Sequence, residues 1–199
     1  MFKVITYAVQ TLLHFSIKPG LAHWEAVKHI FCYLKGTKDL WLLYGGKRGD
    51  LIGQADTDRN MAEDCHVISG YAFLLHGGAV LWTTKWQEII SLSTTKSKYV
   101  ATTYAAKEAL WLCSLLSQLF EINSKPVTLF SDNQSAIVLM KDHQYHACTK
   151  HIDTHFHFIH WIVENRSLQP VYCPTNEMVA DTLTKTQRSS ISQPNLSLH

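Results

Sequence analysis

Three aspartates stand in contexts that could bring their carboxylates together for metal-dependent chemistry. Asp56 closes an apolar run, Asp132 follows the apolar segment 127–131, and Asp181 lies inside the apolar stretch 178–183. Two carboxylates about 4 Å apart repel by roughly 4 kcal/mol at an effective dielectric constant near 20, so gathered aspartates usually share a divalent cation such as Mg²⁺. Two such ions can activate water and stabilise the leaving oxygen of a phosphodiester. An aspartate at the end of a strand, taken singly, is more often a helix cap or a turn residue than a metal ligand.

The elements around these aspartates predict an α/β fold. The predicted strands are 51–56, 70–76, 79–84, 127–131 and 168–173, with a further extended run at 88–92. The predicted helices are 24–36, 94–120, 133–140, 151–163 and a short one around Asp181. The first three strands form an antiparallel meander, with Gly77-Gly78 joining the second and third, and the later strands alternate with helices as in a parallel sheet.

We expect the site to lie at the ends of two neighbouring strands. In such sheets, sites form at the carboxyl ends of neighbouring strands, where we expect Asp56 and Asp132 to lie. Either Asp132 or Asn133 can cap the helix that follows. Pro170 cannot donate a backbone hydrogen bond, so its strand is expected at an edge of the sheet.

Both ends of the chain differ from this central region. The apolar spacing of 24–36 predicts a helix that ends at Gly36, and Leu40–Tyr44 followed by Gly45-Gly46 predicts a strand and a break. We therefore expect three parts: a small unit over 1–46, a main domain over 51–185 and a disordered polar tail over 186–199.

The overall composition describes a folded protein and leaves its partner open. The 199 residues are 46% hydrophobic, and the formal net charge is only +2, so nucleic acid binding would need a local basic patch. Five cysteines without a C-x-x-C pair predict reduced thiols. With no signal-peptide pattern and no apolar stretch long enough for a membrane span, we expect a soluble intracellular protein, cytoplasmic or nuclear.

Seven short motifs occur in order along the central region. They are Gln54–Asp58, Ile68–Leu75, Ser93–Tyr99, Ala105–Leu112, Ser131–Ile137, Thr149–Asp153 and Ala180–Lys185. Together they resemble the ribonuclease H domain of copia-type, retrovirus-related Pol polyproteins. Residues 33–40 are similar to the connection between reverse transcriptase and ribonuclease H, which makes 1–46 the expected remnant of that connection region. No Tyr-x-Asp-Asp polymerase motif is present, so the resemblance implies a truncated copy that starts inside the polyprotein.

The resemblance implies a ribonuclease H-like fold and a set of four carboxylates. The implied sheet has five strands, with three antiparallel strands joined to two parallel ones and helices on both faces. The implied activity is hydrolysis of the RNA strand of an RNA–DNA hybrid with two Mg²⁺ ions, beside a reverse transcriptase domain. Asp56, Asp132 and Asp181 match the three aspartates of the family set, whereas the residue at the glutamate position, just before Tyr99, is Lys98.

The position of Lys98 near the start of a predicted helix also predicts a damaged metal site. With Thr94 or Thr95 as helix cap, Lys98 lies in the first turn, where the helix dipole disfavours cations, and it cannot complete a capping box as glutamate would. An ammonium about 4 Å from a divalent ion is opposed by roughly 8 kcal/mol at the same dielectric constant. We therefore predict that Lys98 pairs with Asp56 or Asp132 in a metal-free cluster and that little or no hydrolytic activity remains.

Several other positions depart from the family pattern and indicate a degenerate copy. Where the motifs usually carry arginine, this chain has Cys65-His66, Trp86, Cys148, His155 and His160. We interpret His155 and His160 as surface replacements, although Cys148, His151 and His155 at helical spacing leave a transition-metal site conceivable.

Two further groups of residues allow a structural and a functional interpretation. An aromatic set is expected in the core rather than as a base-stacking platform: Trp82, Trp86, Tyr99, Tyr104 and Trp111. A set of lysines forms either a basic strip or a solvated face: Lys85, Lys96, Lys98 and Lys107. Two hypotheses remain for function, namely an impaired Mg²⁺-dependent hybrid nuclease and a non-catalytic remnant that binds nucleic acid or protein.

Overall fold

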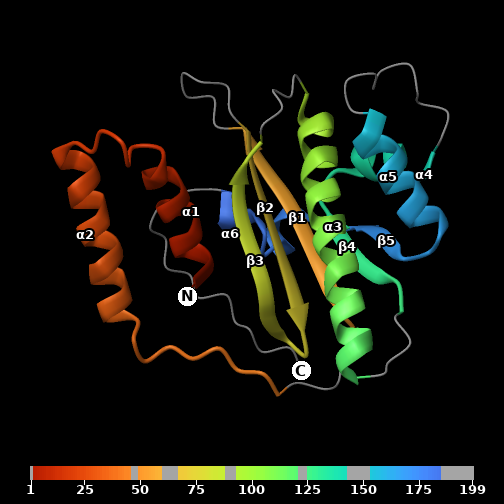
Figure 1. Cartoon of the computed structure of the whole chain (residues 1–199), viewed down its shortest axis with the longest axis horizontal. Helices are drawn as coiled ribbons and strands as arrows, with labels where there is room; N and C mark the ends of the chain where they lie inside the picture. Colours follow the sequence, from red (N-terminus) through yellow and green to blue (C-terminus); the bar gives the residue numbers. More distant parts are fainter. Residues whose placement is uncertain are drawn as a thin grey trace.

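Five strands form one mixed sheet, with helices on both of its faces (Figure 1). The computed structural model describes residues 2–45, 49–59, 67–87, 93–120, 125–142 and 153–184. The strands are β1 (Ile52–Arg59), β2 (Val67–Leu75), β3 (Gly78–Trp86), β4 (Val127–Ser131) and β5 (Leu168–Tyr172), in the spatial order β3-β2-β1-β4-β5. β1, β2 and β3 pair antiparallel, and β4 pairs parallel with β1 and β5. This arrangement confirms the predicted fold class.

Three helices cover the face of the sheet that carries the main hydrophobic core. They are α3 (Thr94–Phe120), α4 (Gln134–Lys141) and α5 (Asp153–Glu164). Side chains alternate between the faces of a strand, so Ala55 of β1 and Phe73 of β2 point into this core, where they meet Val100 and Ala105 of α3. Tyr99 is buried in the same cluster. The small residues along α3 let the helix lie close to the sheet.

The opposite face holds the C-terminal helix α6 (Asp181–Thr184), which contacts β1, β2 and β3. Gly70 of β2 makes this close approach possible, because a Cβ there would lie 2.8 Å from side-chain atoms of Leu183 and Thr184. Two hydrogen bonds fix the helix further. Thr84 of β3 donates to the Leu183 carbonyl (2.9 Å), and Gln54 of β1 accepts from the Val179 backbone N–H (2.6 Å).

Residues before the sheet cover one of its edges. α1 (Phe2–Leu13) packs against α6 and β3, and α2 (Leu21–Gly36) follows it (Figure 1). The His14 ring lies 4.0 Å from the Trp86 ring, and Tyr44 donates to the Ala79 carbonyl (2.6 Å), so both ends of β3 are in contact with this region. Contacts of this kind protect an exposed edge strand.

Several predicted elements differ from the structure. Leu40–Tyr44 is not a strand, because the Tyr44 side chain rather than a backbone ladder reaches β3. The helix α1 was not predicted, and the run 88–92 and the tail from 185 onward lie outside the described residues. β5 is an edge strand, as Pro170 predicted.

Two predictions about side-chain burial are wrong. His160 is only 3% exposed and packs on the Phe156 ring at 4.2 Å, so it is not a surface residue. Trp111 is 55% exposed and not part of the core. Within the described ranges no helix is long and apolar enough to cross a membrane.

Candidate active site

Asp56 and Asp132 come together where β1 and β4 separate. The parallel pairing of the two strands ends at Gln54 and Phe130, so β1 continues past the end of β4. Asp132 follows the last residue of β4 directly. Asp56 lies within β1 rather than at its carboxyl end, which corrects the prediction, because β1 extends to Arg59. The site therefore forms at the end of β4 only, beside the continuing strand.

The helix α4 leaves the Asp132 carboxylate free to face this position. Asn133 caps the helix, since its side-chain oxygen accepts a hydrogen bond from the Ala136 backbone N–H (2.9 Å). Of the two cap candidates in the sequence, the structure selects Asn133. Asp132 is thereby available for contacts with other elements.

The start of α3 places Lys98 opposite the two aspartates. Ser93 caps the helix: its hydroxyl oxygen accepts from the Lys96 N–H (3.2 Å), and its carbonyl accepts from the Ser97 N–H (3.1 Å). The prediction of Thr94 or Thr95 as the helix cap is therefore wrong. With Ser93 as the cap, Lys98 lies beyond the first turn of α3. A glutamate at this position would not complete a capping box. Buried Gln87 ties this turn to the sheet by donating to the Ser97 carbonyl (2.8 Å).

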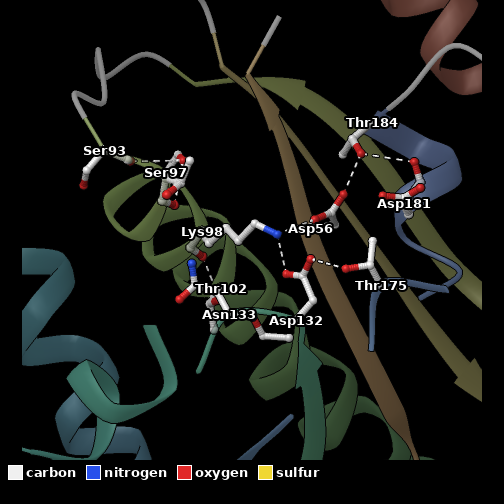
Figure 2. A network of polar contacts seen from close by, with 12 residues as sticks. Asp56, Ser93, Ser97, Lys98, Thr102, Asp132, Asn133, Thr175, Asp181 and Thr184 are labelled. Carbon is white, nitrogen blue, oxygen red and sulfur yellow. Dashed lines mark hydrogen bonds and ion pairs between the residues drawn. The ribbon is translucent and has the colours of Figure 1, made fainter. Parts of the chain in front are cut away.

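Lys98 bridges the two aspartates through its ammonium group (Figure 2). Its Nζ lies 3.2 Å from Asp56 Oδ1 and also donates to Asp132 Oδ1. The side chains of Lys98, Asp56 and Asp132 are 16%, 2% and 8% exposed, so these charges are largely removed from water. The sequence predicted that Lys98 pairs with Asp56 or Asp132, and in the structure it pairs with both.

The C-terminal segment supplies the second contact of each aspartate. Thr184 of α6 donates to Asp56 Oδ2 (2.7 Å), and Thr175, in the short 3-10 helix η3 (Thr175–Glu177), donates to Asp132 Oδ2 (3.0 Å). Asp181 begins α6, and its backbone carbonyl lies 3.1 Å from the Thr184 hydroxyl, whose one proton goes to the nearer Asp56 Oδ2. The predicted third carboxylate therefore lies one helical turn from Thr184.

The pKa shifts in the pocket reflect burial and pairing. Burial raises the pKa of the Asp56 carboxyl, and the Lys98 charge and the Thr184 hydrogen bond offset only part of this rise. Burial also disfavours the charged form of Lys98, but the hydrogen bond to Asp132 and the Asp56 charge outweigh it and raise the pKa of Lys98 above its ordinary value of 10.5. Lys98 is therefore a cation at neutral pH.

The raised pKa of Lys98 gives a pH dependence with a defined sign. A lysine whose pKa is higher in the folded state contributes stability below its unfolded value of 10.5, and this contribution disappears as the pH rises through the folded pKa. The difference in unfolding free energy between the natural protein and Lys98→Met, measured with urea, should stay constant to about pH 10 and shrink above it. A decline already between about pH 7 and 9 would contradict a protonated Lys98.

The residues present do not fit a pair of divalent ions. An ammonium lies between Asp56 and Asp132, where a bridging cation would have to bind. Among the described residues, no group of three or more His, Cys, Asp or Glu side chains is placed to hold a metal ion. The conceivable site at Cys148, His151 and His155 lies outside the residues whose side chains are described.

Some site residues were not recognised in the sequence. Thr184 had a usable signal, because it follows Asp181 by three residues and so lies on the same face of a helix. Thr175 and Gln54 had none, since their contacts depend on how distant segments pack. Gly70 stands inside a strand, a position that often marks a close approach of other backbone.

Solved structures show which fold this is. LC11 ribonuclease H1, in complex with an RNA/DNA hybrid, matches with a TM-score of 0.50 and 16% sequence identity, over 67% of this chain and 93% of that chain. At this identity the match speaks for the fold alone. The sheet order and the helix across the sheet are thus those of a ribonuclease H-like fold.

Sequence relatives identify the family more closely. The Retrovirus-related Pol polyprotein from transposon TNT 1-94 of Nicotiana tabacum is 42% identical over 184 residues, covering 91% of this chain. That of transposon RE2 of Arabidopsis thaliana is 33% identical over 183 residues, again 91% of this chain. No family model matches. The chain belongs to the retrovirus-related Pol polyproteins of copia-type transposons, and it spans 14% and 13% of the length of these two relatives.

Proposed function

We propose that this chain is a ribonuclease H-like domain in which Mg²⁺-dependent hydrolysis of RNA–DNA hybrids is lost or strongly reduced. The single observation that carries the proposal is the Lys98 ammonium between Asp56 and Asp132. A fixed positive charge at this position repels a divalent ion, and it also uses the carboxylate oxygens that would bind one. We therefore assign no hydrolytic step to the pocket in its natural form.

The proposed ancestral substrate is an RNA–DNA hybrid. A ribonuclease H1 of the same fold was solved with such a hybrid, and the relatives are retrovirus-related Pol polyproteins. In the proposed ancestral site, Asp56, Asp132 and Asp181, with a glutamate in place of Lys98, held two Mg²⁺ ions. The change from a carboxylate to an ammonium at one of four positions is enough to exclude that arrangement.

We further propose that residues 1–46 correspond to the connection to a reverse transcriptase domain, which would be the protein partner. α2 has no buried residue, and several of its large apolar side chains are exposed, with Trp24 at 58% and Phe31 at 64%. Trp41, which follows α2, is 84% exposed. Exposed apolar patches of this kind are typical of surfaces that contact another domain.

A second candidate function, binding of nucleic acid without cleavage, is favoured by one surface feature. Lys85 and Lys107 lie over the Tyr104 ring, with Nζ atoms 5.4 and 5.8 Å from its centroid, and Lys107 also lies 5.7 Å from the Phe158 ring centroid. Cations interleaved with aromatic rings can contact both the phosphates and the bases of nucleic acid. Binding of nucleic acid at these lysines and rings would not involve the buried pocket around Lys98.

The experiment that tests the proposal is cleavage of a labelled RNA–DNA hybrid by the full chain in Mg²⁺ and in Mn²⁺. The natural protein is expected to cleave no faster than a protein-free control. Cleavage that disappears in Asp56→Asn would show that the pocket is still active and would overturn the proposal. Retention of the hybrid in a gel-shift assay without cleavage, weakened by Lys107→Ala, would favour the second candidate.

A further inference from the structure

All four carboxylate oxygens of Asp56 and Asp132 accept a hydrogen bond from this chain. Lys98 donates to Oδ1 of both residues, Thr184 donates to Oδ2 of Asp56 (2.7 Å) and Thr175 donates to Oδ2 of Asp132 (3.0 Å). Figure 2 shows the ammonium between the carboxylates and the two threonines on their far side. The pocket therefore satisfies its carboxylates without any bound ion.

The contacts join parts of the chain that are far apart in sequence. Lys98 is separated from Asp132 by 34 residues and from Asp56 by 42, and Thr184 is separated from Asp56 by 128. They connect the sheet at β1 and β4 with the start of α3 on one face and with the C-terminal segment on the other. One ammonium and two hydroxyls thus hold the layers of the domain together at this point.

We propose that Lys98, Thr175 and Thr184 form with Asp56 and Asp132 a structural lock that needs no metal. The ammonium bridges the carboxylates as a divalent cation would in a metal-binding pocket. Thr184 and Thr175 are positioning residues, because each holds the second oxygen of one aspartate and so orients the first toward Lys98. The lock depends only on the geometry of the pocket and holds whether or not the chain binds nucleic acid.

Because the lock is buried, removing one of its members should destabilise the domain. An exposed ion pair contributes little, because water screens it and the side chains lose conformational freedom. Here Asp56 is 2% and Asp132 8% exposed, so removal of Lys98 would leave two carboxylates facing each other in a dry pocket. Breaking a buried pair by removing one partner is strongly destabilising because the remaining charge is uncompensated.

Thermal unfolding of the full chain in EDTA and in 10 mM Mg²⁺ tests the lock directly, because a bound ion would raise the midpoint by mass action. The midpoint of the natural protein should be the same in both buffers within about 1 °C. Lys98→Met should lower it by about 6 to 20 °C in EDTA and should regain part of the loss in Mg²⁺, since the carboxylates are then free to bind a cation. Lys98→Arg keeps the charge and should remain insensitive to Mg²⁺.

The role of Thr184 is tested by a matched pair of variants in α6. Thr184→Val should lower the midpoint by several degrees, and Thr184→Ser should restore it, because serine keeps the hydroxyl donor. The control is Thr182→Val: Thr182 donates only to the Val179 carbonyl (2.8 Å) in the same segment and touches neither aspartate. Thr184→Val and Lys98→Met should also be non-additive when combined, because both act on Asp56.

Three results would overturn the lock. They are a Lys98→Met midpoint within about 2 °C of the natural protein, a natural protein stabilised by Mg²⁺, and additive effects of Thr184→Val and Lys98→Met. If Lys98→Met does not fold, folding of Lys98→Arg supports the lock, and failure of Lys98→Arg contradicts it. None of these measurements involves hybrid cleavage, so they can fail independently of the proposed function.

Discussion

Replacing Lys98 with glutamate is expected to raise the rate of Mg²⁺-dependent cleavage of an RNA–DNA hybrid by at least about 100-fold over the natural protein. The substitution removes an ammonium that opposes a nearby divalent ion by several kcal/mol and adds a carboxylate that can bind it. Since each 1.4 kcal/mol corresponds to a factor of about ten, recovery of even part of this energy gives a large change in rate. The pocket already places Asp56 and Asp132 together beside that position.

Two controls show whether the recovered cleavage comes from the new carboxylate at position 98 and from the Asp56 pocket. Lys98→Met removes the ammonium without adding an oxygen ligand for the metal and should stay close to the background rate. Adding Asp56→Asn to Lys98→Glu should abolish the recovered cleavage. Equal cleavage by the natural protein and by Lys98→Glu, lost in both cases with Asp56→Asn, would show that Lys98 does not impair the site.

Replacing Gly70 with alanine is expected to destabilise the domain by about 1 to 3 kcal/mol through overpacking. A Cβ at this position would lie 2.8 Å from Leu183 Cβ and Thr184 Cγ2 and 3.3 Å from the Ala180 carbonyl oxygen. Because the Leu183 Cβ is fixed to the backbone of α6, the helix must move away from β2. That movement would also separate Thr184 from Asp56, so the free energy of unfolding should fall and the Thr184 contact should weaken.

Gly36 is the matched control for this substitution. It ends α2, and a Cβ there would meet no atom within 4 Å, so Gly36→Ala should leave the stability unchanged or slightly higher. Urea unfolding of both variants and of the natural protein measures the difference. If Gly70→Ala is as stable as Gly36→Ala, the close packing of α6 on β2 is not a requirement of the fold.

Elements with strong local signals were predicted with their correct bounds. The alanine-rich stripe of α3 and the short apolar run of β4 matched the structure at both ends. β1 and β3 extend beyond their predicted limits, because pairing with β2 continues through polar residues such as Asp58 and Lys85. Leu40–Tyr44 has the composition of a strand but lacks a backbone partner, and this depends on tertiary packing.

The charged centre of the pocket was predictable, whereas its supports were not. A pairing of Lys98 with Asp56 or Asp132 followed from the sequence motifs and from the need of gathered carboxylates for a cation, and the structure shows both pairs. The helix cap was misplaced by one or two residues, because Ser93 competes with Thr94 and Thr95 on nearly equal terms. Thr175 carries no local signal, and the signals of Thr184 and Gly70 specify neither the contact with Asp56 nor the docking of α6 on β2.

Mn²⁺ binding to the full chain, followed by electron paramagnetic resonance of the free ion, is the most direct test of whether Lys98 fills the position of a metal. The natural protein should leave the free Mn²⁺ signal unchanged at millimolar concentrations, and Lys98→Glu should reduce it. Binding of Mn²⁺ by the natural protein that is lost in Asp56→Asn would mean that the pocket still accepts a divalent ion beside Lys98, and the proposed replacement of the cation would be wrong.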